Sequence, residues 1–271
     1  MPRKHSRTSQ DVTENEIVRF LEKSFGGAGR GILRGIGDDA AVIHPPGARE
    51  HWVITTDMLL EEVDFRRQWL TPAELGHKAL ATNLSDLAAM GVRPRYYSVA
   101  LAIPPGPGKA WIAAFYRGMT GLAARHGAAL IGGDLSGSRT GIQITITAVG
   151  ETQKKRLLLR SAGRPGDRLY VTGTLGKAAA GLALLLRGTT AGRTPAQRAA
   201  LRAHKTPEPR CDAGLWLARS GLARAGMDLS DGLSTDLSRL CAASGTGAQV
   251  HAASLPLFAG GRSWGCDPLR A

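Results

Sequence analysis

The order of hydrophobic and polar positions along the chain predicts both strands and helices. In residues 142–148, isoleucine or alanine alternates with polar side chains, which is typical of a strand with one buried face. Elsewhere Thr71, Pro72 and Glu74 form a helix start, with threonine as N-cap, proline at the first position and glutamate at the third. The apolar pattern behind them predicts a helix that ends near Met90.

The same reasoning predicts the remaining elements. In the first half we expect helices over residues 13–24 and 109–126, strands over 40–43, 52–55 and 96–103, and a buried run over 128–131 followed by a turn at 132–134. In the second half we expect helices over 176–186, 211–219 and 233–243, with strands at 169–172, before 228, and at 248–252. Strands and helices mix without a strict βαβ rhythm, so we predict an α/β fold with mixed sheets and two lobes.

A change of composition divides the chain. With 271 residues it has the length of one and a half to two average domains. We expect a basic flexible tail (1–12), an N-terminal domain (13–150) and a C-terminal α/β domain (151–271), with the boundary in a basic segment that precedes a Pro-Gly turn. The sequence has neither an apolar run of about 18 residues nor a secretory signal, so we expect a cytoplasmic protein without membrane contact.

The charge balance suggests an anionic partner. The chain has 35 Lys and Arg against 22 Asp and Glu, a formal net charge of +13. Such an excess fits nucleic acid or a phosphorylated small molecule, and a solvated basic surface is the alternative. The basic residues are scattered and aromatic residues make up 5% of the chain, so no specific nucleic acid is expected. The three cysteines lack paired spacing, and we interpret them as reduced.

Two glycine-rich segments resemble nucleotide motifs only superficially. Residues 35–40 fit G-x-G-x-x-A, but no hydrophobic strand precedes them, and two adjacent aspartates would repel a pyrophosphate. Residues 173–177 lack the glycine spacing of a P-loop, and Ala178 replaces its serine or threonine.

Aspartates are the more informative signal. Seven of them lie mostly beside Gly, Ser or Thr and next to apolar runs: Asp38, Asp39, Asp57, Asp86, Asp134, Asp228 and Asp231. Each alone fits a helix cap or an Asx turn. Together they provide the hard oxygen ligands that Mg²⁺ prefers, and several magnesium ions with a nucleoside triphosphate would fit such a set.

Two of these aspartates lie on or beside predicted helices. Asp86 is one turn from Asn83, so the two polar groups share a helix face while leucines line another face. A buried polar face needs partners, and an ion would supply one. Asp228 and Asp231 lie at the start of another predicted helix, where Ser230 or Asp231 could also serve as N-cap.

Five segments resemble, in order, motifs of the thiamine-monophosphate kinase family, which is related to aminoimidazole ribonucleotide synthetase and selenophosphate synthetase. They are GIGDDAAVI (35–43), TTDML (55–59), KALATNLSDLAAMG (78–91), GGD (132–134) and DLSDGL (228–233). The resemblance covers residues 14–255, and the helix motif NLSDLAAMG is its most specific part. It implies a two-lobed fold in which an N-terminal α/β domain dimerises and shares an ATP cleft with a C-terminal α/β domain.

The resemblance also implies roles for single residues. The expected magnesium ligands are Asp38, Thr55, Thr56, Asp57, Asp86, Asp134, Asp228 and Asp231. The expected ATP contacts are Gly133, Asp134, Arg160 and Ser230. The family has a histidine against the thiamine phosphate, and Asp64 stands at that position here. The family chain also continues beyond the point that matches Ala271, through a Gly-Gly-Glu-Asp-Tyr segment. We therefore expect an incomplete C-terminal lobe with unpaired strand edges. We also expect this chain to keep ATP binding better than it keeps phosphoryl transfer to the acceptor.

The function that the resemblance implies is ATP-dependent phosphorylation of thiamine monophosphate to thiamine diphosphate, within a homodimer. A phosphate monoester has a second pKa of about 6, so the acceptor is already an anion and no general base is expected. Magnesium ions and Arg160 would neutralise the two anions and hold them in line. The alternatives are a sister kinase or synthetase with another acceptor, and a non-catalytic dimer or basic RNA-binding module.

Overall fold

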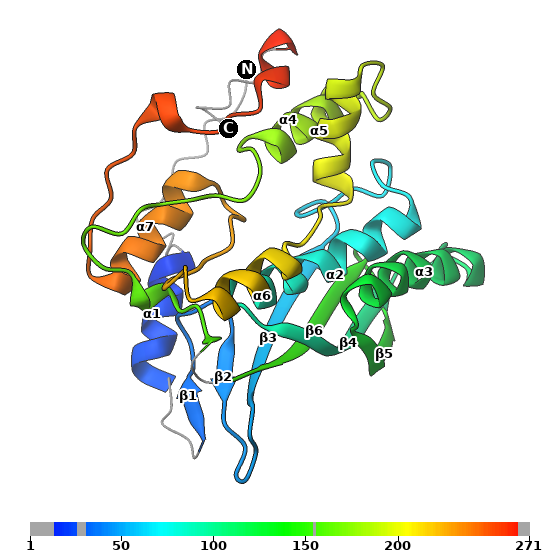
Figure 1. Cartoon of the computed structure of the whole chain (residues 1–271). Helices are drawn as coiled ribbons and strands as arrows, with labels where there is room; N and C mark the ends of the chain where they lie inside the picture. Colours follow the sequence, from blue (N-terminus) through cyan, green and yellow to red (C-terminus); the bar gives the residue numbers. More distant parts are fainter. Residues whose placement is uncertain (1–13, 26–30, 154–155, 265–271) are drawn as a thin grey trace.

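The computed structural model describes residues 14–25, 31–153 and 156–264 and contains a six-stranded mixed sheet with helices on one face (Figure 1). The predicted tail and Cys266 lie outside these residues. The strands are β1 Ile32–Arg34, β2 Ala41–Ile43, β3 His51–Leu60, β4 Arg93–Ile103, β5 Ala129–Gly137 and β6 Gln143–Thr152. Their order in the sheet is β1-β2-β3-β6-β4-β5, in which only β4 and β5 are parallel.

Helices α2 (Pro72–Ala89) and α3 (Lys109–His126) cover the sheet. The predicted start of α2 is confirmed, because Thr71 Oγ1 accepts the Glu74 N–H at 3.2 Å and Glu74 Oε2 accepts the Thr71 N–H at 2.7 Å. The two helices approach closely where Gly118 lies against Ala73, since a Cβ on Gly118 would be 1.9 Å from the Ala73 carbonyl oxygen. Their buried leucines and the isoleucines of β6 form the main core.

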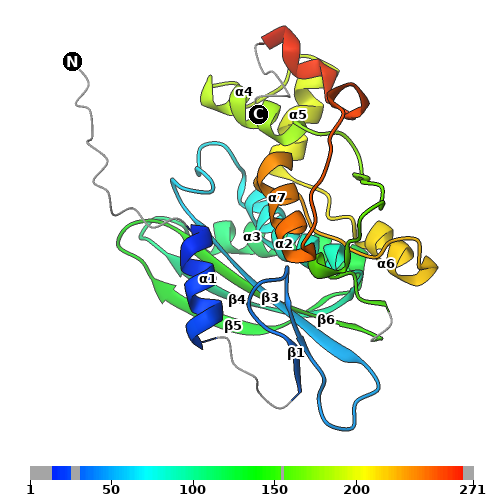
Figure 2. The same ribbon diagram turned by 90° about the vertical axis from the view of Figure 1, so that its left-hand side faces the viewer.

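The described chain after β6 consists of helices and the segments that connect them, and it lies on the side of α2 away from the sheet (Figures 1 and 2). It contains α4 Lys177–Leu186, α5 Pro195–Lys205, α6 Cys211–Ser220 and α7 Leu233–Ser244, with short 3₁₀ turns η2 Arg160–Ala162, η3 Ala252–Ser254 and η4 Ala259–Trp264. Helices α4 and α5 pack against each other around a second small core. Helix α1 (Glu14–Phe25) precedes the sheet in the chain. The described helices include none with the length and apolar character that a bilayer crossing requires.

Three predicted strands are wrong. Residues 169–172, the run before 228 and residues 248–252 form no strand, and the described residues of 156–264 contain only an isolated bridge between Leu175 and Leu257. A short apolar run becomes a strand only when a neighbour completes its hydrogen bonds, and here Tyr170 remains 83% exposed. The strand edges expected in this lobe are therefore absent from the described residues.

Helix α5 was not among the predicted elements, although its start carries the same signals as that of α2. Thr194 is the N-cap, Pro195 follows it, and Gln197 completes a capping box. The basic residues behind it obscure the apolar stripe, of which Ala200 and Leu201 are buried.

The turn predicted at residues 132–134 is also wrong. These residues lie inside β5, which is an exposed edge strand, so the run 128–131 is not buried either. Glycine is required here by close approach, because a Cβ on Gly133 would lie 1.9 Å from the Val99 carbonyl oxygen. Two adjacent glycines indicate a turn from sequence alone, but an extended chain against a neighbouring strand uses them equally well.

Candidate metal and nucleotide site

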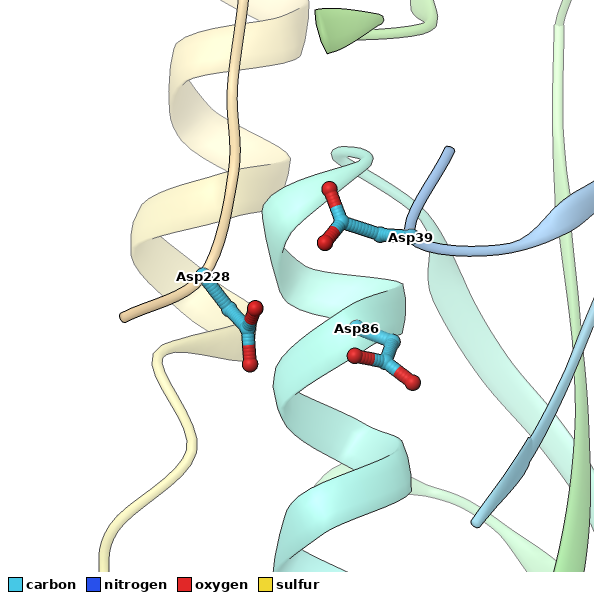
Figure 3. A group of neighbouring side chains, drawn as sticks. All are labelled: Asp39, Asp86 and Asp228. Carbon is cyan, nitrogen blue, oxygen red and sulfur yellow. The ribbon is translucent and has the colours of Figure 1, made fainter. Parts of the chain in front are cut away.

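Three carboxylates from distant parts of the sequence converge on one point. Asp39 precedes β2, Asp86 is on α2, and Asp228 lies in the segment before α7. Each offers an oxygen, and these atoms all lie within 4.8 Å of one another (Figure 3). Asp39 is buried and the other two are half-buried, so the group lies at the junction of the sheet lobe and the helical lobe.

The face of α2 that meets β3 carries the first part of the site. The Thr55 hydroxyl donates to the Asp86 carboxylate, and Asn83 Nδ2 donates to Asp57 Oδ2 at 2.9 Å. Thr55 and Asp57 share this face because side chains alternate along a strand. Asn83 and Asp86 therefore share one face of α2, as their helical spacing predicts, and the structure shows that this face meets β3.

Arg160, in η2, connects the loop before β2, which contains Asp38 and Asp39, to the helical lobe. Its Nη2 contacts Asp39 Oδ1, and its backbone N–H is 3.3 Å from Asp38 Oδ2. Ser244 of α7 donates to the Arg160 carbonyl. Asp38 is thus used to hold the backbone of η2, and Asp39, which the resemblance did not single out, is the member of the pair that joins the cluster.

Burial and mutual repulsion make it unfavourable for all three carboxylates of the cluster to be ionised without a bound cation. Burial, followed by the negative charges of Asp57, Asp228 and Asp39, raises the pKa of Asp86 to about 9. Burial and then Asp39 raise the pKa of Asp228 to about 7. Like charges held this close favour a bound cation, and the all-oxygen donor set is suited to Mg²⁺.

Asp39 carries a further indication of a missing partner. Its Oδ2 is buried and has no hydrogen-bond partner among the described residues. A buried carboxylate oxygen without a partner costs free energy, and a metal ion at the cluster would satisfy it.

The other predicted ligands lie outside this cluster. Thr56 points to the opposite face of the sheet, where its hydroxyl is 2.9 Å from that of Thr147. Gly133 and Asp134 are exposed on the edge strand β5, and the register places Asp134 beside Ala100 on that same opposite face. Asp231 is exposed and pairs with Arg239 at 2.6 Å.

The predicted acceptor residue, Asp64, lies in the turn after β3. Its Oδ2 accepts the Leu60 N–H at 2.7 Å, and its carbonyl oxygen is 3.4 Å from Lys78 Nζ. Burial lowers the pKa of Lys78, which is on α2. Glu62 in the same turn has φ +68°, an uncommon conformation for a residue with a Cβ. The ammonium group therefore contacts the backbone of this turn, and the nearby Asp64 charge partly offsets the effect of burial on the pKa of Lys78.

Sequence reasoning also missed Asp236 on α7. Its side chain is 1% exposed and accepts three backbone N–H groups from the segment that carries Asp228. An acidic residue in the first turn of a helix is the signal that could have indicated it.

Known proteins share both lobes. Residues 37–152 match the family model "AIR synthase related protein, N-terminal domain", and residues 164–271 match "AIR synthase related protein, C-terminal domain". Thiamine-monophosphate kinase of Bacillus subtilis is 38% identical over 226 residues, which cover 82% of this chain and 68% of the relative. That of Synechococcus elongatus is 40% identical, with 81% and 68% covered. A solved structure described as AaThiL complexed with AMPPCP and TMP superposes with a TM-score of 0.87 at 29% identity and covers 98% of this chain and 82% of that one.

Proposed function

The chain belongs to the thiamine-monophosphate kinase family, and from that premise we propose that it transfers the terminal phosphoryl group of ATP to thiamine monophosphate, giving thiamine diphosphate. The observation that carries this proposal is the cluster of Asp39, Asp86 and Asp228 beside Arg160. A relative of the same fold in complex with AMPPCP and TMP supports a nucleotide and a phosphorylated acceptor as the two substrates.

The residues that would hold Mg²⁺ are the three clustered aspartates, with Asp57 and Thr55 next to them. The support is the unpartnered Asp39 oxygen and the raised pKa values of Asp86 and Asp228, which burial and neighbouring carboxylates cause. Bound Mg²⁺ would neutralise the phosphate oxygens and allow two anions to approach. Asp38 then serves the site by holding the backbone of Arg160.

Arg160 is the proposed protein contact for the nucleotide phosphates. Its guanidinium group is paired with Asp39, and its side chain is 18% exposed. A cation held by Asp39 would weaken that pairing, and the N–H donors of Arg160 would then be able to bind a phosphate oxygen. On the strength of the family resemblance, Ser230 remains a candidate ATP contact and Asp231 a candidate magnesium ligand. Gly133 and Asp134 lie on edge strand β5, where Asp134 faces away from the aspartate cluster.

The acceptor is proposed to enter beside the turn after β3. A phosphate monoester needs no general base at neutral pH, so the residues here have only to bind and orient it. Lys78 is a cation at this place, and Asp64, whose carboxylate accepts the Leu60 N–H, contributes an opposing charge. Arg66 and Arg67 also lie here, but each is paired with a glutamate of the turn. The pair would set the affinity for an anionic acceptor.

We also propose a homodimer formed through the face of the sheet opposite α2. Trp52, Met58 and Tyr96 share this face and are each at least 50% exposed. Large exposed apolar side chains on one face mark an interaction surface. Light scattering should give twice the chain mass, and the pair of changes Trp52→Glu and Met58→Glu should give the monomer mass.

The proposal is tested by a coupled assay with thiamine monophosphate, ATP and Mg²⁺, together with calorimetry of ATP binding. Asp86→Asn and Asp228→Asn should abolish detectable turnover and weaken Mg-ATP binding. Asp212→Asn removes an exposed carboxylate from the start of α6 and should leave both unchanged. ATP binding that persists in EDTA and in both cluster variants would contradict the proposal. Normal ATP binding without transfer to thiamine monophosphate would instead favour a kinase with another acceptor.

A further inference from the structure

Asp236 is a buried carboxylate around which the segment containing Asp228 is folded. Its Oδ2 accepts the backbone N–H groups of Ser230, Asp231 and Gly232 at 3.0, 3.1 and 3.1 Å. Gly232 has φ +106°, which lets the chain turn into α7 directly over this carboxylate. Three consecutive backbone groups are therefore fixed by one side-chain oxygen.

Arg239 closes the other side of this arrangement. Its Nη1 is 3.4 Å from Asp236 Oδ1 and 2.6 Å from Asp231 Oδ2. Since Arg239 lies one turn after Asp236 on α7, both charges belong to the same rigid element. The segment is thus held at its backbone by Asp236 and at the Asp231 side chain by Arg239.

Consecutive N–H groups at the start of a helix normally form a binding place for an external anion such as a phosphate. In this chain Asp236 already occupies that place, and no N-cap side chain competes for it. The backbone donors are therefore unavailable to a nucleotide phosphate. What the segment presents to the site is the carboxylate of Asp228, which lies with Asp39 and Asp86.

We propose that Asp236 is a positioning residue that serves as an internal anion: it fixes residues 228–232 so that the Asp228 carboxylate completes the metal cluster, and it thereby sets the affinity for metal-bound nucleotide. This inference rests on the proposed function, because it assigns the cluster to Mg-ATP. It adds a residue that does not itself touch the cation or the phosphates.

Amide hydrogen exchange tests the arrangement without any ligand. In the unmodified chain, the amides of Ser230, Asp231 and Gly232 should exchange slowly. Asp236→Asn should speed their exchange at least about tenfold, because hydrogen bonds to a charged acceptor are replaced by weaker ones. Rapid exchange of these three amides in the unmodified chain overturns the proposal, and this measurement needs no variant to fold.

Calorimetry of ATP binding at a series of Mg²⁺ concentrations tests the consequence. Asp236→Asn should raise the Mg²⁺ concentration for half-maximal ATP binding at least about tenfold. Leu201→Ala, in the small core between α4 and α5, gives a destabilised control that should keep the unmodified Mg²⁺ dependence. Equal Mg²⁺ dependence in Asp236→Asn and the unmodified chain overturns the proposal. Absence of Mg-ATP binding in the unmodified chain would instead overturn the proposed function, while the exchange result would still stand.

Chemical rescue separates positioning from general loss of structure. Asp236→Ala leaves the three N–H groups and Arg239 facing a space that a small carboxylate can enter. In this variant, formate should lower the Mg²⁺ concentration for half-maximal ATP binding part of the way to the value of the unmodified chain. It should leave that concentration unchanged in Leu201→Ala and in the unmodified chain. An effect of formate that is equal in all three chains counts against the internal-anion role.

Discussion

The Ser85 hydroxyl donates to Asp228 Oδ2 at 3.2 Å, although 143 positions separate the two residues. This hydrogen bond joins α2 to the segment before α7 and holds Asp228 against the next residue of α2, Asp86. The cluster of Asp39, Asp86 and Asp228 therefore exists only while the two parts of the chain are docked. Variants that disturb this docking should weaken nucleotide binding at a degree of destabilisation that leaves the sheet folded.

Removal of a negative charge from the cluster should stabilise the chain in the absence of Mg²⁺. Burial and neighbouring carboxylates raise the pKa of Asp228 from 3.8 to about 7 in the folded chain. The folded chain favours the protonated form of Asp228. This contribution to the free energy of unfolding is fully present below about pH 3.8 and is lost as the pH rises through about 7. Asp228→Asn should therefore raise the Tm in EDTA at pH 8 by roughly 2–4 °C, the shift expected for about 1 kcal/mol, and by less at pH 5.

Calorimetric melting at the two pH values checks this effect, with Asp212→Asn as the exposed control. Mg²⁺ should stabilise the unmodified chain at pH 8 more than it stabilises Asp228→Asn. A Tm increase of the same size at pH 5 and pH 8 would show that the carboxylate charge is not its cause.

Asp39 should matter more than Asp38 for nucleotide binding. Asp39→Asn removes a charge from the cluster and should weaken Mg-ATP binding at least about tenfold. Asp38→Asn keeps an oxygen for the backbone N–H of Arg160 and should weaken binding less. Titration calorimetry measures the Mg-ATP affinity of both variants. A larger loss of affinity in Asp38→Asn than in Asp39→Asn would support the ligand set that the family resemblance implies.

The turn after β3 should control the acceptor rather than ATP. Lys78→Gln removes the ammonium group beside Asp64 and should raise the KM for thiamine monophosphate about tenfold with little change in the KM for ATP. Asp64→Asn keeps an acceptor for the Leu60 N–H while it removes the opposing charge, and should lower the KM for thiamine monophosphate. Steady-state kinetics with each substrate varied in turn measures both effects. Parallel changes in the two KM values would place this turn away from the acceptor.

A pair of glycines on α3 should separate helix propensity from close packing. Gly118→Ala would put a Cβ 1.9 Å from the Ala73 carbonyl oxygen and should destabilise the chain by about 2–3 kcal/mol. Gly121→Ala meets nothing within 4 Å and should stabilise it by about 0.4–1 kcal/mol. Urea unfolding of both variants measures the difference, and similar values would contradict the tight contact between α2 and α3.

Elements whose signal lies within a few neighbouring residues could be predicted from the sequence in both lobes. Thr71 and Glu74 form a capping box from residues three apart, and residues 142–148 alternate, so each pattern contains its own physical cause. The predicted helices 109–126, 176–186 and 211–219 correspond to α3, α4 and α6 within one residue. The aspartates likewise indicated oxygen-ligand chemistry before any geometry was known.

Tertiary structure decided what depends on distant partners. Residues 132–134 became part of a strand because β4 lies beside them. Residues 169–172 did not, because no strand within 14–25, 31–153 or 156–264 pairs with them. The choice of Asp39 over Asp38 for the cluster, and the role of Asp236, depend on which way a carboxylate points after the two lobes meet. Residue spacing describes neighbours within one element, whereas contacts across more than a hundred positions depend on how separate elements pack.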